Sequence, residues 1–398
     1  RLTAEIDHLR DLGFDEHDEY KVMGLAPYGD PARYRAFFDQ AVATFPEGRF
    51  RVDPGLVSYL MWRDGALRGK RGLYPRGMVR ALGPARLPEE PITQRHEDVA
   101  AALQEALERS VLHKLAPLRE TTGERHLCMA GGVALNSTMN GKIARSGLFD
   151  GVWIHPAAHD AGTSVGAAFY GHHNVLGQPL RAARTPEVYL GPAHDARAVE
   201  RGLAAFASRI VTRRPEALYE DVADAISAGK VVGFFHGRME WGPRALGNRS
   251  ILADPRREDM RDIVNHAVKL REGFRPFAPA CLLEHADEWF DMLGLGESPH
   301  MLFVVPVRED KRGRIPAVTH VDGSARVQTV SARQSPRFHA LIEAFHRRTG
   351  VPVLLNTSFN VKGEPIVNTP QDAVRCFLGT HIDVLVIDDV VIEKAPPA

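Results

Sequence analysis

Two successive segments in the first half of the sequence each combine a short strand, a glycine turn and a helix, and they restrict the fold most. In the first segment, residues 125–130 predict a buried strand that leads into Gly131-Gly132, and residues 136–146 follow a helical pattern. In the second, residues 151–154 predict the strand and the small residues 166–170 the helix. Strand, turn and helix in repetition are typical of a layered domain, so we predict the α/β fold class.

The remaining sequence predicts a second α/β unit. The whole chain has 398 residues, a length that fits two domains. Proline and glycine interrupt the pattern of helices and strands near residue 190. We therefore place one domain at residues 1–190, a linker at 191–207 and a second domain at 208–398. An amphipathic helix is expected at 96–118 in the first domain. In the second, strands are expected at 231–235, 300–307, 325–330, 351–355 and 383–387, and helices at 218–228, 257–268, 337–349 and 370–378.

Charge and cysteine usage limit the classes of partner. Lysine plus arginine number 50, as do aspartate plus glutamate, which argues against a broad electrostatic surface for nucleic acid or a membrane but leaves room for a local basic pocket. No apolar run reaches the length of a membrane span. The three cysteines are far apart and follow no ligand spacing, so we expect a reducing, cytoplasmic environment.

The glycine loop after the first predicted strand is a candidate phosphate site. Gly131 and Gly132 would let the backbone approach a phosphate, and the helix that begins near Asn136 would offer free N–H groups to it. The alternative is a tight turn that binds nothing.

The second strand ends in a histidine- and aspartate-containing loop. His155, His159 and Asp160 follow it at the edge of the sheet where ligands bind in open α/β folds. Asp160 could hold a metal ion or magnesium phosphate, or it could cap the following helix.

The second half contains arginine-rich segments that are not surface helices. Arg238, Arg244 and Arg249 are spaced among glycines, a proline and a tryptophan, and guanidinium groups recognise phosphate and carboxylate through paired hydrogen bonds. A solvated loop is the alternative. The segment 269–279 adds Lys269, Arg271 and Arg275 in an aromatic, proline-containing context.

Two further segments of the second half carry polar side chains at predicted strands. Arg326 and Gln328 would point the same way on a strand over 325–330, because side chains alternate with period two. Asn356 and Ser358 close another strand. Together with the arginines, these residues predict a pocket for a small ligand that carries negative charge.

At this point the sequence resembles the NodU/CmcH family of O-carbamoyltransferases, which includes antibiotic-tailoring enzymes. The matching motifs span nearly the whole chain in the order of the family: residues 21–29, 131–136, 160–162, 242–250, 271–279, 320–328 and 356–363. The resemblance implies the back half of a Kae-like domain, of the actin-type ATPase fold, over residues 1–190. It implies a YrdC-like domain over residues 208–398.

The resemblance also implies a reaction and its components. The YrdC-like domain would form carbamoyl adenylate from ATP, with Mg²⁺, and carbamoyl phosphate. The Kae-like domain would transfer the carbamoyl group to a hydroxyl of a small molecule, a natural product or a saccharide, near a bound Fe²⁺ or another divalent metal. A homo-oligomer is compatible with this arrangement.

By the same resemblance, individual residues acquire expected roles. Asp160 matches the metal-binding aspartate, and Gly131, Gly132 and Asn136 match the adenylate-binding loop. Arg326, Lys269 and Arg244 would be catalytic. Those expected to bind nucleotide or carbamoyl phosphate are Arg249, Arg275, Asn356 and Ser358.

The sequence departs from the family pattern at two points. The family takes a histidine pair, spaced HxxxH, from the front half of the Kae-like domain, and this chain has no counterpart of it, because His17, His96, His113 and His126 lie in other contexts. Arg1 opens what reads as the middle of a helix, so we expect the front lobe to lie outside this chain. His159 stands where relatives usually carry a small residue. Two other functions stay open: a threonylcarbamoyl-type tRNA modification enzyme, and a nucleotide-binding module without transfer activity.

Overall fold

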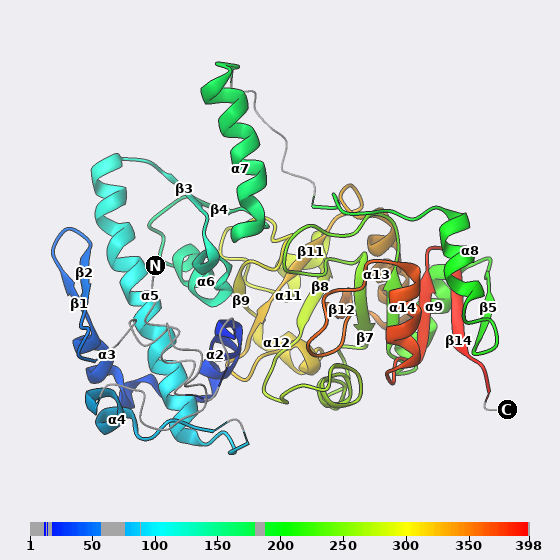
Figure 1. The fold of residues 1–398 in the computed structure, drawn as a ribbon, viewed down its shortest axis with the longest axis horizontal. Coiled ribbons are helices and arrows are strands. Elements are labelled where there is room, and N and C mark those ends of the chain that lie inside the picture. The colour runs from blue at the N-terminus through cyan, green and yellow to red at the C-terminus, as the bar shows by residue number, and fades with distance from the viewer. Residues whose placement is uncertain are drawn as a thin grey trace. The chain divides into compact units, whose positions relative to one another are not determined.

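The computed structural model describes Leu12, Phe14 and residues 18–56, 76–87, 89–179 and 188–396 (Figure 1). The chain forms two compact units. Unit 1 comprises residues 1–127 and 138–152, and unit 2 comprises residues 128–137 and 153–398. No helix among the described residues is long and apolar enough to cross a membrane.

Unit 1 is organised around one long helix, α5 (Gln94–Thr122). Val99, Leu103 and Leu107 are buried along one of its faces, and the helix ends at Gly123, which adopts the left-handed backbone conformation with φ of 70°. The other elements of unit 1 are α2 (Glu19–Leu25), η1 (Ala26–Tyr28), η2 (Pro31–Arg33), α3 (Arg35–Ala41), the hairpin β1 (Val42–Phe45) and β2 (Arg49–Val52), α4 (Arg76–Leu82), and all but the first residue of α6 (Ser137–Arg145).

The division between the units passes through a two-stranded sheet of β3 (His126–Met129) and β4 (Gly151–Ile154). The parts of unit 2 next to it are η5 (Gly132–Leu135), η6 (Asp160–Gly162), α7 (Thr163–Tyr170) and the π-helix η7 (Gly171–Val175).

An eight-stranded mixed sheet forms the core of unit 2. The order of its strands is β11-β8-β12-β7-β6-β13-β14-β5, with β11/β8 and β13/β6 parallel and the other pairs antiparallel. The strands are β5 (Ile210–Arg213), β6 (Val232–Phe235), β7 (Arg249–Ala253), β8 (Ala278–Leu282), β11 (Gln328–Val330), β12 (Val353–Ser358), β13 (Val384–Ile387) and β14 (Val390–Lys394).

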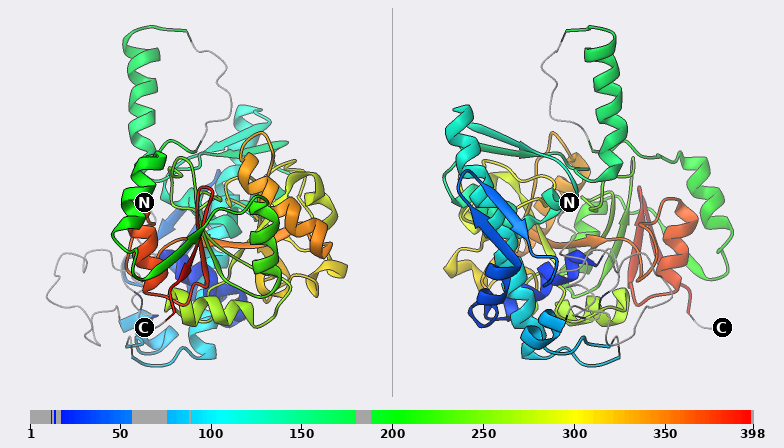
Figure 2. Two further views of the ribbon diagram at one scale, coloured as in Figure 1. Left: turned by 90° about the vertical axis from the view of Figure 1, so that its right-hand side faces the viewer. Right: turned by 60° about the vertical axis from the view of Figure 1, so that its left-hand side comes forward.

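Helices cover both faces of this sheet. In the left view of Figure 2, α9 (Leu218–Ser227) and α13 (Pro336–Thr349) lie on one side and α8 (Ala196–Ala204) and α14 (Pro370–Leu378) on the other. Successive residues of β6 show why, since Phe234 packs near Phe338 of α13, whereas Phe235 faces the opposite way. The strands β6, β8 and β13 are therefore buried on both faces and contain no polar side chain.

Shorter elements complete unit 2. They are α10 (Met260–Ile263), which continues as the π-helix η8 (Val264–Lys269), η9 (Leu283–His285), α11 (Ala286–Trp289), the pair β9 (Val304–Pro306) and β10 (Ser324–Arg326), α12 (Glu309–Arg312), and η10 (Pro316–Val318).

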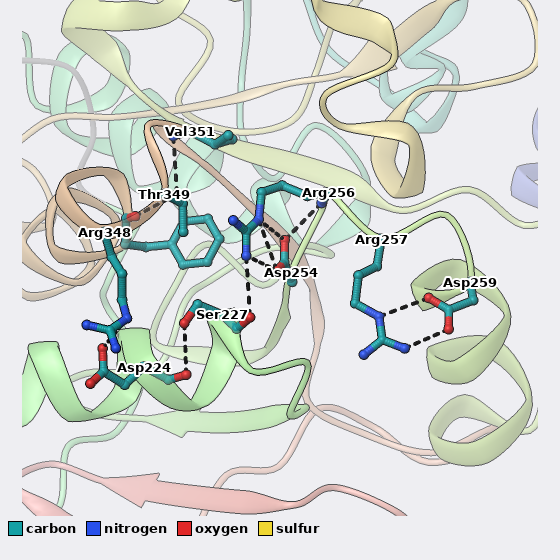
Figure 3. A network of polar contacts seen from close by, with 10 residues as sticks. Asp224, Ser227, Asp254, Arg256, Arg257, Asp259, Arg348, Thr349 and Val351 are labelled. Atoms are coloured by element: carbon teal, nitrogen blue, oxygen red, sulfur yellow. Dashed lines mark hydrogen bonds and ion pairs between the residues drawn. The ribbon is translucent and has the colours of Figure 1, made fainter.

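A network of paired charges fastens α9 and α13 near β7 (Figure 3). Asp254, which is 1% exposed, accepts hydrogen bonds from the Arg256 guanidinium at 2.6–3.1 Å, and the same guanidinium donates to the Ser227 carbonyl of α9. Arg348 of α13 pairs with Asp224 of α9 at 2.6 Å. Each of these arginines has a carboxylate of its own.

The α/β class is confirmed, and most predicted helices and strands are present. Two local predictions are wrong. The strand predicted over 325–330 is broken at Val327, so Arg326 lies on β10 and Gln328 on β11, in different sheets. The helix predicted over 257–268 is only partly α-helical, because the chain widens into a π-helix after Ile263. The expected middle of a helix at the start of the chain lies outside the described residues.

The segment 191–207, predicted as a linker, contains α8, which packs against α14. The residues just before α8 run alongside the segment 238–241. Trp241 N donates to Val188 O at 2.6 Å, Gly191 N to Met239 O at 2.9 Å and Met239 N to Pro192 O at 2.9 Å. The domain boundaries at 190 and 208 stay a prediction.

Candidate functional site

Arg244 and Arg326 are the core of the candidate site. Both side chains are partly exposed, and the Nε atom of each is buried without a hydrogen-bond partner. Within the described part of the chain, neither guanidinium forms a hydrogen bond or an ion pair. Burial lowers the pKa of Arg244 to about 10, with a contribution from the nearby charge of Arg275.

The two arginines belong to a larger cationic cluster. Burial lowers the pKa of Arg326, and so do the neighbouring charges of Arg244, Arg271 and Arg275. Arg275 lies 3.6 Å from the carboxylate of Glu272. Since like charges at close range repel, this arrangement is suited to a ligand that brings several negative charges.

Lys269 completes the cationic cluster at the end of η8. It is 4% exposed, and its Nζ donates to Ser358 O at 2.8 Å and Oγ at 3.2 Å, and to Asn360 O at 2.8 Å and Oδ1 at 2.5 Å. Burial, followed by the charge of Arg271, lowers the pKa of Lys269 to about 7. The amine thus ties the end of β12 to the arginines, and its charge depends on pH near neutrality.

Arg249, predicted to bind ligand, is fully buried and differs from the cluster. Its guanidinium donates to the carbonyls of His236 at 2.7 Å, Asn248 at 2.9 Å, Gly237 at 3.1 Å and Pro192 at 3.4 Å, and it lies over the Phe235 ring at 3.6 Å. These contacts join the chain on both sides of the loop between β6 and β7. Arg249 therefore fixes the backbone at both ends of this loop.

Asn356, also predicted to bind ligand, is 1% exposed and faces the same loop. Its Nδ2 donates to Gln328 Oε1 at 2.8 Å and to Ala245 O at 3.4 Å. Gln328 Nε2 in turn donates to Leu246 O at 2.9 Å. Ser358, in contrast, is partly exposed beside Lys269.

The glycine loop and the loop at 155–162 lie together in unit 2. Gly131 has a φ of 102°, which favours glycine, and its N–H donates to Ala158 O at 2.7 Å. Gly132 opens η5, which ends before Asn136. The 155–162 loop also approaches the loop between β6 and β7, residues 236–248, which contains Arg238 and Arg244 and is called the arginine-rich loop below. The His155 and Trp241 rings are 5.4 Å apart, and a Cβ on Gly242 would lie 3.3 Å from Pro156 O.

Asp160, the predicted metal ligand, is exposed at the start of η6. Across the residues that the structure describes, no three histidine, cysteine, aspartate or glutamate side chains gather in a group that could hold a metal ion. His159 Nδ1 is buried without a hydrogen-bond partner, but one carboxylate and one imidazole make an incomplete set. The ligand set is therefore incomplete among the described residues, and no chemical step is assigned to a metal ion.

Two family models match the chain along most of its length. The model described as "Carbamoyltransferase N-terminus" matches residues 10–169, and "Carbamoyltransferase C-terminus" matches residues 223–394. The chain belongs to the carbamoyltransferase family. The resemblance to NodU/CmcH enzymes and the predicted transferase class are thus confirmed for the family, whose members use a carbamoyl donor and an acceptor.

Individual relatives agree with this carbamoyltransferase assignment. Nodulation protein NolO of Bradyrhizobium diazoefficiens is 46% identical over 98% of this chain and 68% of its own length. Nodulation protein NolNO of Sinorhizobium fredii is 47% identical over 98% of this chain and 55% of its own length. Nodulation protein U of Rhizobium tropici is 36% identical over 75% of this chain and 51% of its own length. The chain thus spans between about half and two thirds of the length of these three relatives.

The candidate site also involves residues that the sequence analysis did not select as site residues. Arg271 is among the cations expected in segment 269–279 but has no predicted role of its own, and it contributes charge to the cluster. Asn360 is only a neighbour of predicted residues in the sequence, and its side-chain oxygen accepts a hydrogen bond from Lys269. Glu240 gave no signal, because a single acid within a basic, glycine-rich segment looks like a solvated counter-charge. Its environment proves to be the interior of the loop, at 5% exposure.

Proposed function

We propose that the chain is an O-carbamoyltransferase that forms carbamoyl adenylate and passes its carbamoyl group to a hydroxyl of a small molecule, a natural product or a saccharide. One observation carries the proposal: Arg244 and Arg326 lie close enough to repel each other, and neither has a counter-ion or hydrogen-bond partner among the described residues. ATP, bound with Mg²⁺, and carbamoyl phosphate together supply the missing negative charge.

The cationic cluster supplies what the first half-reaction needs. Carbamoyl phosphate loses its phosphate to water and gives carbamate, whose oxygen then attacks the α-phosphorus of ATP as pyrophosphate leaves. Negative charge grows on the leaving groups, and guanidinium donors fixed in place stabilise it. We assign Arg244, Arg326 and Lys269 to this role, with Arg275 and Ser358 as further contacts to the phosphates.

The second half-reaction is an acyl transfer. The acceptor oxygen attacks the carbonyl carbon, the carbon–oxygen bond to AMP breaks, and the acceptor loses a proton. AMP is a stable leaving group, so no protein nucleophile is required. Gly131, Gly132 and Asn136 are assigned to the adenylate. The role of Asp160 in holding Fe²⁺ or another divalent metal stays a prediction.

The finer fold assignment belongs to this proposal. We assign the back half of a Kae-like domain to residues 1–190 and a YrdC-like domain to 208–398. Support comes from the mixed sheet of unit 2, along whose loops and strand ends the cationic cluster gathers. We also propose that the protein acts in the cytoplasm.

The test is a two-substrate assay. The purified chain is incubated with ATP, Mg²⁺ and carbamoyl phosphate, and released pyrophosphate is measured. We expect release that requires carbamoyl phosphate and that falls in Arg244→Ala. Folded protein that binds neither ATP nor carbamoyl phosphate and releases no pyrophosphate would overturn the proposal. Candidate hydroxylated acceptors are then screened for AMP formation.

A further inference from the structure

Glu240 lies at the centre of the loop that carries Arg244. Its Oε1 accepts hydrogen bonds from the backbone N–H groups of Leu246 at 2.7 Å, Asn248 at 2.7 Å and Arg249 at 3.2 Å. The loop can close around one oxygen atom because two of its residues are glycines with positive φ, 126° at Gly242 and 117° at Gly247.

Within the described residues, the hydrogen bonds that the Glu240 carboxylate accepts all come from backbone N–H groups of residues 246–249, and its charge also offsets part of the burial that lowers the pKa of Arg249. Its Oε2 atom is buried and has no hydrogen-bond partner. Burial raises the pKa of Glu240, which shows that the interior is an unfavourable place for this charge. A buried acid whose hydrogen bonds all serve one loop indicates that the geometry of this loop matters.

The other side of the loop is held just as closely. Leu246 O accepts hydrogen bonds from Gln328 Nε2 at 2.9 Å and from the Tyr189 hydroxyl at 3.1 Å, and Ala245 O accepts one from Asn356. The two residues that follow Arg244 are therefore fixed through both their carbonyls and, at Leu246, through the N–H. Among the residues that the structure describes, the Arg244 side chain has no such contact.

We propose that Glu240 is a positioning residue that acts through Arg244, by fixing the loop so that this guanidinium stays in the cationic cluster. Repulsion from Arg275 and Arg326 would drive a loosely held Arg244 into solvent, and a loop fixed at its backbone resists that displacement. The inference rests on the proposed function, since it assigns Glu240 to the binding of the phosphates.

The experiment compares Glu240→Gln with a matched control, Asp254→Asn. Both variants remove one buried carboxylate charge in unit 2, but Asp254 serves the Arg256 pair and does not contact the loop. Glu240→Asp is the second variant: it keeps the charge but shortens the reach by one methylene. Each is made alone and in the Arg244→Ala background.

Two quantities are measured on every variant that folds. One is the rise in melting temperature that inorganic phosphate produces, and the other is kcat/KM for carbamoyl phosphate in the pyrophosphate assay. We expect Glu240→Gln and Glu240→Asp to reduce the phosphate effect and to lower kcat/KM about 10- to 100-fold. In the Arg244→Ala background, either change should lower kcat/KM by less than about twofold, because the group through which Glu240 acts is gone.

The outcomes separate the two proposals. If Arg244→Ala leaves both the phosphate effect and kcat/KM unchanged, the proposed function is wrong. If Arg244→Ala weakens both but the Glu240 variants match Asp254→Asn at equal loss of melting temperature, or if their effects add to that of Arg244→Ala, Glu240 is only structural and the inference is overturned. A Glu240→Gln protein that does not fold leaves the decision to Glu240→Asp.

Discussion

Two sets of arginines in unit 2 differ in what surrounds them. Arg256, Arg257 and Arg348 each pair with an aspartate at 2.6 Å (Figure 3). Arg244 and Arg326 have no acidic partner among the described residues and lie beside further cations instead. The whole chain has equal numbers of acids and bases, so the difference comes from their distribution.

The comparison separates cations whose charge is offset inside the protein from cations that, in the function proposed above, bind a ligand. A paired guanidinium has its charge offset inside the protein, and removal of its partner leaves a charge that is expensive to bury. An unpaired guanidinium beside other cations is already unfavourable, so its removal costs the fold little. In the proposed function, ligand binding explains its presence.

Arg326→Ala, which removes one of the two unpaired arginines, should have the largest effect on the rate of the reaction. Loss of a charge-assisted contact in a water-poor site costs about 2–4 kcal/mol of transition-state stabilisation, hence a rate of carbamoyl-adenylate formation lower by about 30- to 1000-fold. The melting temperature should change little, because Arg326 stabilises no neighbour. An unchanged rate, or a large fall in melting temperature, would contradict this view of Arg326.

Asp254→Asn breaks the paired set and should show the opposite profile. The charge of Arg256 would lose its partner, and the free energy of unfolding should fall by about 1.5–3 kcal/mol. Because the Asp254 carboxylate contacts Arg256 and, among the described residues, no member of the cationic cluster, kcat/KM should stay near the wild-type value. Urea unfolding together with the pyrophosphate assay checks both. A kinetic defect at full stability would show that the two sets of arginines are not independent.

The smallest effect concerns pH. The pKa of Lys269 is lowered from its ordinary value of 10.5 to about 7, so the unfolded chain binds more protons than the folded chain between pH 7 and 10.5. The Lys269 contribution to the free energy of unfolding should therefore rise with pH across this window. The affinity for anions should fall as the pH rises, because the amine loses its charge.

Sulfate is the suitable probe, because its own charge is constant over this pH range. Its dissociation constant should increase from pH 6 to pH 8.5 in the wild type by more than in Lys269→Met. Equal pH dependence in the two proteins would rule out Lys269 as the titrating group. Lys269→Arg, which keeps the charge at both pH values, is the matched control.

Much of the fold could be predicted from local patterns. The α5 helix has apolar residues every four positions, and the strands β6 and β13 are continuous apolar runs between turn residues. The break at Val327 could not be predicted, because it depends on pairing with distant strands. The residues before it, in β10, pair with β9, whereas the residues after it, in β11, pair with β8 at the edge of the large sheet. No local pattern encodes which sheet a strand joins.

The residue types of the candidate site could be predicted better than the role of each residue in it. Arginine among glycines indicated anion binding, and Arg244, Arg275 and Arg326 do lie in one electrostatic cluster. Arg249 has the same sequence context as Arg244, yet it is buried against four carbonyls. The direction of a side chain on β7 is set by the register of that strand with β6 and β12, and only long-range pairing determines that register.

The segment 188–192 has a practical consequence for dissecting the protein. A fragment that begins at residue 208, after the predicted linker, would lack Val188 and Pro192, whose carbonyls accept hydrogen bonds from Trp241 and Met239. It would also lack the Tyr189 hydroxyl that donates to Leu246 O. The arginine-rich loop would then keep its sequence but lose part of its frame. A fragment meant to retain anion binding should therefore include residue 188.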